Sequence, residues 1–419
     1  MRELKLTVIG SGSTYSPEIF EGIINRREML NVRRVSLMDI DERKLEIVGG
    51  LIKRMLSAGG VDAQVELTTD LDRALSGADY VIAQIRVGRL PARVLDERIP
   101  LKYGLIGQET TGIGGFFKGL RTIPEILKVA KKMEQLCPNA VLINFSNPSG
   151  LVAEAVQNSS VIPMTGLCNI PINMITDMKK HVGMDADVTY FGLNHLSWIT
   201  SVKKDGKELM PELITSYEAE DIPKKYYPLC GGFPCGYLQY YYTRRHKLEE
   251  LTEKAKGKTR GEECMEIEEQ LLELYSDAGL YVKPEQLSKR GGALYSEAAV
   301  SLLNAIENKL PEFHVVNVRN NGALPWMADD DVVETKVLVQ GKEFIPVPVR
   351  GFENDHIKNL MRTVKAYEKH AARAALTGDR DEAIRALLIH PLIGDGDAAA
   401  ACFEEMLQAH RAYLPQFFA

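Results

Sequence analysis

The chain has 419 residues, of which 45% are hydrophobic and 26% charged, close to the averages of soluble globular proteins. This composition excludes a disordered protein, a collagen and a coiled coil. The length exceeds what one hydrophobic core usually organises, so we expect two domains or one large elaborated domain. The 51 Lys and Arg residues against 57 Asp and Glu residues give a formal charge of −6, without the basic excess of a nucleic-acid-binding protein.

The first ten residues turn directly into a strand and show no charged segment followed by a long apolar one, which a secretory signal requires. No run approaches the roughly 18 apolar residues of a transmembrane helix. The six cysteines are scattered, without the framework of a small disulfide-linked secreted domain. We therefore expect a cytoplasmic protein that partners neither a membrane nor a nucleic acid.

The first half of the chain alternates strand-like and helix-like stretches. Apolar, β-branched runs predict strands at residues 4–9, 34–38, 63–67, 80–85, 140–145 and 161–164. Apolar residues at helical spacing predict helices at 17–30 and 42–58. This rhythm predicts the α/β class, with a Rossmann-like, doubly wound parallel sheet covered by helices on both faces.

From about residue 187 the pattern changes. Short strands at 188–191 and 199–202 and a β-branched stretch at 315–348 are combined with long helical tracts at 262–275, 297–307 and 356–376. We interpret this half as a second α+β domain, which lies over the carboxyl ends of the first sheet in an architecture like that of lactate and malate dehydrogenases. The boundary is placed at residue 195, which gives domains of 1–195 and 196–419.

A glycine-rich turn, Gly10-Ser-Gly12, follows the first strand and opens a helix, as in a dinucleotide-binding fingerprint. Such glycines let the backbone approach a pyrophosphate at the helix N-terminus. Tyr15 stands where the third glycine is expected, so the fingerprint is incomplete. Asp39, which ends the second strand, can accept from a ribose 2′-hydroxyl and favours NAD over NADP. The predicted cofactor-binding residues are Gly10, Ser11, Gly12, Ser13, Thr14 and Asp39, although a glycine-rich turn without a ligand has the same pattern.

Cys168 and His195 are candidate metal ligands. Cys168 follows a predicted strand, and His195 lies at the predicted domain boundary. A thiolate and a neutral imidazole suit a borderline divalent metal and leave positions open for substrate oxygens. Twenty-seven positions separate the two residues, so the spacing is equally compatible with two buried core residues.

The tyrosine-rich segment 237–242 is a candidate source of a general base. A tyrosine acts as a base only where neighbouring cations lower its pKa from about 10, and Arg244, Arg245 and Arg260 are near in sequence. A partly buried aromatic helix face shows the same pattern. A second group of arginines follows the predicted strand at 80–85: Arg86, Arg89, Arg93 and Arg98. These side chains could bind a phosphate or a carboxylate, but a solvated protein surface shows the same pattern.

Taken together, these motifs resemble those of glycoside hydrolase family 4. The resemblance covers nearly the whole chain and rests on motifs in the expected order: Gly10-Ser-Gly-Ser-Thr-Tyr-Ser-Pro-Glu18, Ile99-Pro-Leu-Lys-Tyr-Gly-Leu-Ile-Gly-Gln-Glu-Thr-Thr-Gly112, Asn144-Phe-Ser-Asn-Pro148, Gly166-Leu-Cys-Asn-Ile-Pro171, Gly192-Leu-Asn-His195, Tyr237-Leu-Gln-Tyr-Tyr241 and Lys289-Arg-Gly-Gly292. The first turn departs from the Gly-Gly-Gly that is commoner in relatives, a change that a phosphate-cradling turn should tolerate.

The resemblance implies NAD, a divalent cation that is usually Mn²⁺, and a 6-phosphorylated sugar as substrate. It assigns Cys168 and His195 to the metal and Tyr237 to the catalytic base. The residues that it assigns to substrate binding are Arg93, Asn147, Asn169 and Arg260. Residues 1–195 are then the NAD-binding domain, and residues 196–419 the substrate-binding and oligomerisation domain of a homodimer or homotetramer.

Asn169 bears on the anomer that the resemblance implies. In the family that this chain resembles, members that act on 6-phospho-α-glucosides have Cys-Asp at this place, whereas the 6-phospho-β-glucosidases have Cys-Asn. This chain has Cys168-Asn169, so the resemblance favours the β-glucosidase branch. An asparagine cannot be the leaving-group acid, and that acid stays unassigned.

The family differs from glycosidases that use two carboxylates. It implies hydride abstraction from C3 by NAD⁺, removal of the C2 proton by Tyr237, elimination of the leaving group from C1, and addition of water. Three alternatives stay open: a 6-phospho-α-glucosidase or related family 4 glycosidase, an NAD-dependent 2-hydroxy-acid dehydrogenase, and a catalytically silent sugar-phosphate sensor.

Overall fold

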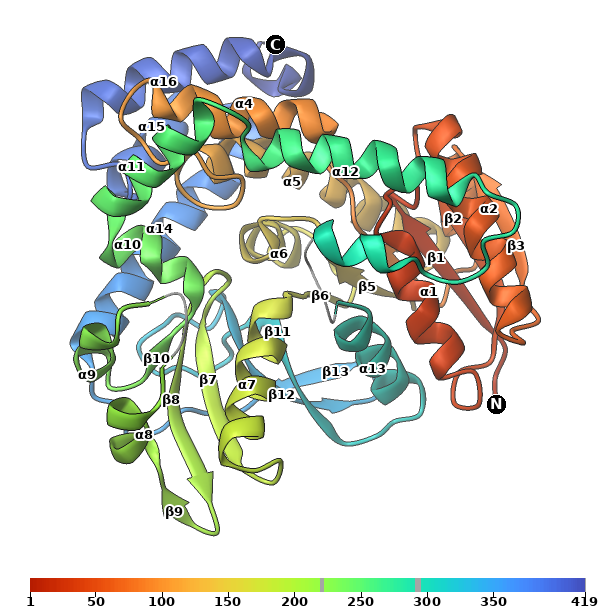
Figure 1. The fold of residues 1–419 in the computed structure, drawn as a ribbon, viewed down its shortest axis with the longest axis horizontal. Helices are drawn as coiled ribbons and strands as arrows, with labels where there is room; N and C mark the ends of the chain where they lie inside the picture. The colour runs from red at the N-terminus through yellow and green to blue at the C-terminus, as the bar shows by residue number, and fades with distance from the viewer. Residues whose placement is uncertain (219–221, 291–294, 419) are drawn as a thin grey trace.

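The computed structural model describes residues 1–218, 222–290 and 295–418. Within these residues, one sheet of 13 strands runs through both halves of the chain (Figure 1). Its order is β10-β8-β7-β12-β11-β6-β5-β4-β1-β2-β3, with β9 paired to β8 and β13 paired to β12 beside that path.

The first six strands form the parallel part of the sheet, in the Rossmann order 3-2-1-4-5-6. They are β1 (Leu4–Ile9), β2 (Val32–Met38), β3 (Gln64–Thr68), β4 (Tyr80–Ala83), β5 (Val141–Asn144) and β6 (Met164–Gly166). All residues of β1, β4, β5 and β6 are buried, as expected where helices cover both faces. The strand order reverses between β1 and β4, and ligands of such sheets bind beyond the carboxyl ends at this point.

The strands of the second half continue the same sheet in antiparallel fashion. They are β7 (Asp187–Leu193), β8 (Leu196–Lys204), β9 (Lys207–Glu208), β10 (Phe233–Pro234), β11 (Glu312–Arg319), β12 (Val332–Gln340) and β13 (Glu343–Pro346). The junction is made by β6 and β11, where Asn317 pairs with Gly166. The α+β half is therefore joined to the Rossmann-like half by backbone hydrogen bonds as well as by packing.

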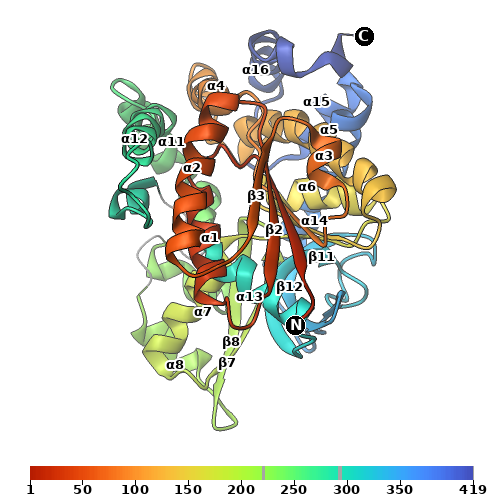
Figure 2. The same ribbon diagram turned by 90° about the vertical axis from the view of Figure 1, so that its right-hand side faces the viewer.

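Helices cover both faces of the parallel strands. Figure 2 shows α1 and α2 on one side of β1–β3, with α3, α5 and α6 on the other. The helices of the first half are α1 (Ser16–Asn25), α2 (Glu42–Ala58), α3 (Leu71–Leu75), α4 (Arg89–Leu101), α5 (Gly112–Leu136), α6 (Ser149–Gln157) and α7 (Asn169–Val182). Those of the second half are α8 (Met210–Ser216), α9 (Tyr227–Cys230), α10 (Gln239–Tyr242), α11 (Arg244–Ala255), α12 (Arg260–Tyr275), α13 (Tyr295–Glu307), α14 (Asp355–Thr377), α15 (Arg380–Ile389) and α16 (Gly396–Ala409).

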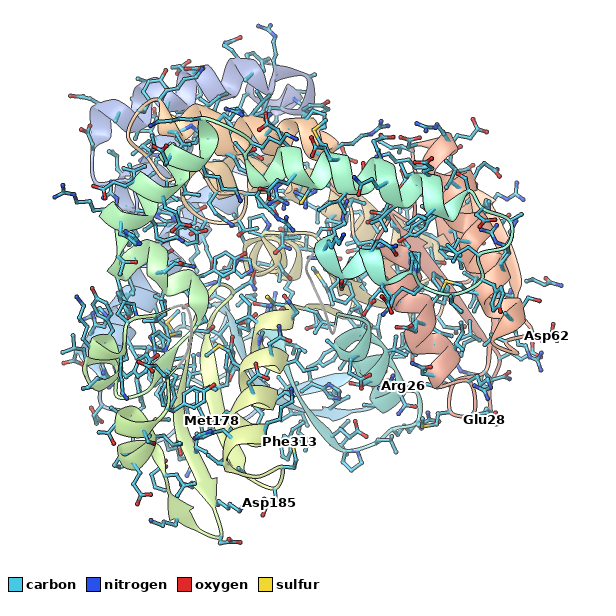
Figure 3. All side chains as sticks on the ribbon, in the orientation of Figure 1. Arg26, Glu28, Asp62, Met178, Asp185 and Phe313 are labelled. Carbon is cyan, nitrogen blue, oxygen red and sulfur yellow. The ribbon has the colours of Figure 1, made fainter. Side chains whose placement is uncertain are left out.

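Two hydrophobic clusters form the core, and both draw on the two halves of the chain. One includes Phe116 and Phe117 of α5 together with Trp198 and Phe403. The other contains residues of β1 and β2 together with residues of α12 and α13, among them Tyr275 of α12. Charged side chains such as those of Asp62 and Asp185 lie at the periphery (Figure 3).

The predicted fold class is confirmed, and most predicted elements lie within a few residues of the observed ones. The helix predicted at 42–58 has these bounds because Asp41 caps it, accepting from the backbone N–H of Lys44. The strand predicted at 161–164 instead begins at Met164, since Pro163 has no N–H to pair and Val161 is exposed. No helix in the described part of the chain is long and apolar enough to cross a membrane.

Candidate active site

A cleft of about 1420 Å³ lies at the carboxyl ends of the parallel strands. The turns after β1, β2, β4 and β5 line one side of it, and α12 contributes Arg260, Cys264 and Glu268 to its wall. The cleft extends from the glycine-rich turn at Gly10 to His195 and Tyr237. The strand ends, where ligands of such sheets bind, thus open into this cleft.

The turn after β1 brings the backbone close to its neighbours. Gly10 has a φ of +85°, and a Cβ on it would lie 2.8 Å from the carbonyl oxygen of Gln84. A Cβ on Gly12 would lie 2.9 Å from Oδ2 of Asp39. Gly10 therefore requires glycine, whereas a side chain at position 12 would displace the Asp39 carboxylate. The absence of side chains at both positions leaves the turn open toward the cleft.

Asp39 has a structural role in this turn. Its carboxylate accepts from the backbone N–H groups of Gly12, at 2.8 Å, and Asp41, at 2.9 Å. Burial raises the pKa of this carboxyl, although both hydrogen bonds oppose the shift. Asp39 still lines the cleft, so its carboxylate is available to a hydroxyl group there.

The six predicted cofactor residues divide into two sets. Gly10, Gly12, Ser13 and Asp39 line the cleft. The side chains of Ser11 and Thr14 are buried instead, and their hydroxyls have no hydrogen-bond partner among the described residues. A dinucleotide fits this turn, because the open cradle at Gly10 and Gly12 admits a phosphate close to the backbone.

His195 follows β7 in a turn with a φ of +65° and is buried at the inner end of the cleft. Its Nδ1 has no hydrogen-bond partner among the described residues. Burial lowers the pKa of this histidine to about 3, and the nearby Lys118 acts in the same direction. The imidazole is therefore neutral at physiological pH, which is the state that binds a metal.

Cys168 lies after β6, at the first turn of α7, and is buried. Burial raises the pKa of its thiol, and Glu334 raises it further, whereas a hydrogen bond with Asn194 lowers it. Asn194 is the neighbour of His195, so the two predicted metal ligands come from adjoining turns. No group of three Cys, His, Asp or Glu side chains is placed to hold a metal among the described residues. The thiol and the unpartnered imidazole nitrogen fit a divalent metal whose other positions are open.

Tyr237 lies in a short 3-10 turn (Gly236–Leu238), and its ring stacks on that of His195 with centroids 4.1 Å apart and 4° between planes. Burial raises the pKa of its phenol, and Glu109 raises it further, whereas a hydrogen bond with Thr110 lowers it. The arginines that follow in sequence do not offset this. Arg244 donates to the carbonyl of Ile393, and Arg245 pairs with Glu249 and is 93% exposed. Of the three arginines near Tyr237 in sequence, Arg244 and Arg245 thus point elsewhere, and only Arg260 lines the same cleft.

A charged wall lies beside these residues. Glu109 pairs with Arg86, with Arg93 at 2.9 Å and with Lys118 at 2.7 Å. Burial opposes ionisation of Glu109, but these three cations hold its pKa well below its usual value. Burial lowers the pKa of Lys118 to about 7, with Arg86 acting in the same direction. Arg290 also lines this part of the cleft.

The predicted substrate residues all line the same cleft: Arg93, Asn147, Asn169 and Arg260. Arg93 is held by Glu97 at 2.7 Å as well as by Glu109. Arg260 pairs with Glu263 at 3.1 Å and donates to the carbonyl of Lys289. The glycines of the motif at 289–292 lie outside the described residues.

Sequence reasoning did not single out Glu109, Lys118 or Arg290 as site residues. Glu109 and Arg290 stand within motifs that carry the family resemblance, so the motifs held a signal for them. Lys118 lies in a helix rich in apolar residues, and the sequence there does not show whether its side chain points into the cleft or to solvent. Only the fold brings these three beside Arg93 and Arg260.

Two profiles of known families match the chain. "Family 4 glycosyl hydrolase" matches residues 5–184, and "Family 4 glycosyl hydrolase C-terminal domain" matches residues 190–393. Together they account for most of the chain.

Full-length relatives show the same similarity. A probable 6-phospho-β-glucosidase of Bacillus subtilis is 43% identical, over 99% of this chain and 98% of the relative. A structure of the Thermotoga maritima 6-phospho-β-glucosidase with manganese, NAD⁺ and glucose 6-phosphate is 34% identical, has a TM-score of 0.90 and covers 98% of this chain and 99% of its own. A phospho-α-glucosidase of Clostridium acetobutylicum is 29% identical over 99% of both chains.

More distant structures share the fold alone. A malate dehydrogenase of Plasmodium falciparum is 12% identical, with a TM-score of 0.52 over 89% of this chain and 98% of its own. The predicted likeness to the architecture of lactate and malate dehydrogenases is therefore confirmed at the level of fold.

Proposed function

This chain belongs to the family 4 glycosyl hydrolases, and on that basis we propose that it hydrolyses 6-phospho-β-glucosides with NAD and a divalent metal, Mn²⁺ in the first instance. One observation carries the proposal. A single cleft joins a dinucleotide-type turn at Gly10 to the neutral imidazole of His195 and the stacked ring of Tyr237, and the buried thiol of Cys168 directly precedes Asn169, which lines the same cleft. An NAD-dependent reaction on a metal-bound sugar needs these two parts side by side.

Each cofactor has residues that fit it. The glycine-rich turn and Asp39 would hold NAD, and Cys168 and His195 would hold the metal. When bound, NAD⁺ accepts and returns the hydride of sugar C3, and the divalent cation is a Lewis acid toward the sugar oxygens. His195 needs no deprotonation for this role because burial already keeps it neutral.

Tyr237 is the proposed base for the C2 proton. In the described structure, burial raises the pKa of its phenol, so it carries its proton in the absence of a nearby cation. Its ring lies directly on the ring of His195, which places it beside the proposed metal site. A divalent positive charge there favours the phenolate and lowers the pKa of the phenol.

The charged wall is the proposed binding site for the substrate phosphate. Arg86, Arg93, Lys118, Arg260 and Arg290 all line the cleft. Their present partners are the carboxylates of Glu97, Glu109, Glu263 and Glu268, so a phosphate would share these cations with the carboxylates. Arginine forks bind phosphate in bidentate fashion, so this wall suits the 6-phosphate. Asn147 and Asn169 offer amides that can hydrogen-bond sugar hydroxyls from the same cleft.

Two observations favour the β-anomer over the α-anomer. Asn169 stands after Cys168, where the family resemblance associates Asn with the β-enzymes. The chain is also more similar to the β-glucosidase relatives than to the α-glucosidase relative. A 2-hydroxy-acid dehydrogenase is the remote alternative, supported by fold alone.

Three further predictions belong to this proposal. The division into a cofactor domain (1–195) and a second domain (196–419) is supported in outline by two family profiles, although the second profile begins at residue 190, within the proposed first domain. The protein is proposed to act in the cytoplasm and to assemble as a homodimer or homotetramer.

Release of nitrophenol from the paired α- and β-anomers of nitrophenyl glucoside 6-phosphate tests the proposal. Each anomer is assayed with and without NAD⁺, Mn²⁺ and a chelator. We expect turnover of the β-anomer that requires both NAD⁺ and metal. Preference for the α-anomer would overturn the anomer assignment alone, and hydrolysis that is indifferent to NAD⁺ and metal would overturn the whole site. Steady formation of NADH with a 2-hydroxy acid would favour the dehydrogenase.

A further inference from the structure

A buried carboxylate, Glu334 of β12, lies behind the proposed metal site and takes no part in the chemistry above. Its side chain is fully buried. Oε2 accepts from the hydroxyl of Tyr190 at 2.6 Å, and Oε1 accepts from Asn194 at 3.1 Å and Asn317 at 3.3 Å. These donors are neutral, and Glu334 forms no ion pair with a Lys or Arg in the described ranges. Burial raises the pKa of its carboxyl to about 7, although the three hydrogen bonds oppose the shift, so the group ionises fully only above neutral pH or beside a cation.

The two amides that converge on Glu334 lead to the two turns of the metal site. Asn194 immediately precedes His195, and its own Oδ1 accepts from the backbone N–H of Gly150. Asn317 also donates to the carbonyl of Gly166, two residues before Cys168, at 3.1 Å. Glu334 is thus connected to the turn of His195 through Asn194 and to the turn of Cys168 through Asn317.

A buried carboxylate without a cationic partner is costly, because hydrogen bonds from neutral groups replace only part of its hydration. A second negative charge arises nearby when Cys168 binds metal as a thiolate, and Glu334 already acts electrostatically on that thiol. One divalent cation balances two such negative charges. The described residues supply no cation that pairs with Glu334, and a bound divalent metal would supply one.

We infer that Glu334 is a positioning residue for the divalent cation: it orients the turns of Cys168 and His195 and supplies a buried negative charge that the cation balances. The inference rests on the proposed function, because it takes Cys168 and His195 as the ligands. It gives Glu334 no contact with substrate and no place among the ligands.

Titration of the metal-free full-length protein with Mn²⁺, with free Mn²⁺ measured by electron paramagnetic resonance, tests the inference without substrate. Glu334→Gln keeps the shape and one acceptor oxygen but removes the charge. Tyr190→Phe is the matched control when both variants are measured at about pH 8, since it removes one hydrogen bond but keeps the carboxyl group, which the bound cation can still ionise. We expect Glu334→Gln to weaken Mn²⁺ about 10–100-fold, the range for losing a supporting group behind a metal ligand, and Tyr190→Phe to stay within about threefold of wild type.

Thermal unfolding separates this role from a merely structural one. In a chelator at about pH 8, above the raised pKa of Glu334, Glu334→Gln is expected to melt at or above the wild-type temperature, because the substitution removes an unbalanced buried charge. Mn²⁺ is expected to stabilise the wild type more than the variant. A variant that melts well below wild type in chelator, yet binds Mn²⁺ equally well, would overturn the inference.

A second variant covers the case in which Glu334→Gln does not fold. Asn194→Ala cuts the link between Glu334 and the His195 turn, and we expect it also to weaken Mn²⁺; wild-type affinity in Asn194→Ala would overturn the inference. If the wild-type protein itself binds no Mn²⁺, the proposed metal site fails first. If instead the wild type and Glu334→Gln bind Mn²⁺ equally well, the proposed metal site stands and only the role of Glu334 is overturned.

Discussion

The two ends of the cleft are built in different ways. The cofactor end consists of one short turn, in which the backbones of Gly10 and Gly12 approach their neighbours and Asp39 ties the turn to the next strand. The metal end is assembled from the turns after β6 and β7 and from Tyr237, with Glu334 of β12 behind them. The first end depends on backbone conformation, whereas the second depends on buried side chains from distant parts of the sequence. Substitutions at the two ends are therefore expected to affect different measurements.

The largest effect is expected from Tyr237→Phe. Loss of a general base costs about 10²–10⁴-fold in rate, so turnover should fall at least about a hundredfold. The binding of NAD and Mn²⁺ should be unchanged, because the phenol oxygen belongs to neither proposed site. Steady-state kinetics and calorimetric titrations measure the two effects. Tyr242→Phe is the control, since this tyrosine contacts Cys230 and His356; equal activity in both variants would remove Tyr237 from its role.

Removal of the thiol is expected to weaken the metal and to spare the cofactor. Cys168→Ser should reduce Mn²⁺ affinity by roughly a hundredfold or more, above the 10–100-fold cost of losing a supporting group. Calorimetry with Mn²⁺ and with NAD in the same preparation measures both. Unchanged Mn²⁺ affinity would contradict the assignment of Cys168.

Metal affinity should also depend on pH with a predictable sign. Burial raises the pKa of the Cys168 thiol, so this group is protonated at neutral pH and must release its proton when metal binds. Affinity therefore increases with pH, about tenfold per unit between roughly pH 6 and 8. His195 adds no slope in this window, because its pKa is lowered to about 3. Glu334 adds to the slope below about pH 7, because burial raises its pKa to about 7 and its ionised form favours the cation. Titrations in buffers of different ionisation enthalpy count the released proton, and a flat profile in the wild type would contradict the thiolate.

Gly12→Ala tests whether a change at the cofactor end of the cleft affects NAD binding without affecting the metal. The new Cβ would lie 2.9 Å from the Asp39 carboxylate, and such crowding typically costs 1–3 kcal/mol. NAD affinity should fall about tenfold, whereas Mn²⁺ affinity should remain at the wild-type level. Gly60→Ala is the control, because its Cβ would meet nothing within 4 Å; its φ of +72° is positive, unlike that of Gly12. Equal NAD binding in the two variants would show that the turn does not cradle the cofactor.

The smallest effect is expected from Asp39→Asn. The amide oxygen can still accept one backbone N–H, but the charge that repels a 2′-phosphate is lost. The preference for NAD over NADP should narrow by about fivefold, on the scale of one hydrogen bond. Fluorescence titration with both dinucleotides measures the ratio, and an unchanged ratio would limit Asp39 to its structural role in the turn.

The same contrast explains what the sequence could and could not predict. The turn at Gly10 and the helix at 42–58 depend on neighbours in sequence, and both lie where they were expected. Glu334 could not be found in this way, since it stands in a β-branched strand where a single acidic residue usually points to solvent. Whether Arg244 and Arg245 act on Tyr237 could not be predicted from their closeness in sequence, because both lie on α11, which directs them to Ile393 and Glu249.

The unbroken sheet has a consequence for work with fragments of the protein. Cutting the chain at residue 195 would expose the edge of β6, which β11 covers, and would remove α12 and α13 from a core that they share with β1 and β2. An unpaired strand edge beside exposed apolar surface promotes aggregation. The two halves are thus expected to unfold as one cooperative unit, so each half is best studied by substitution within the intact chain.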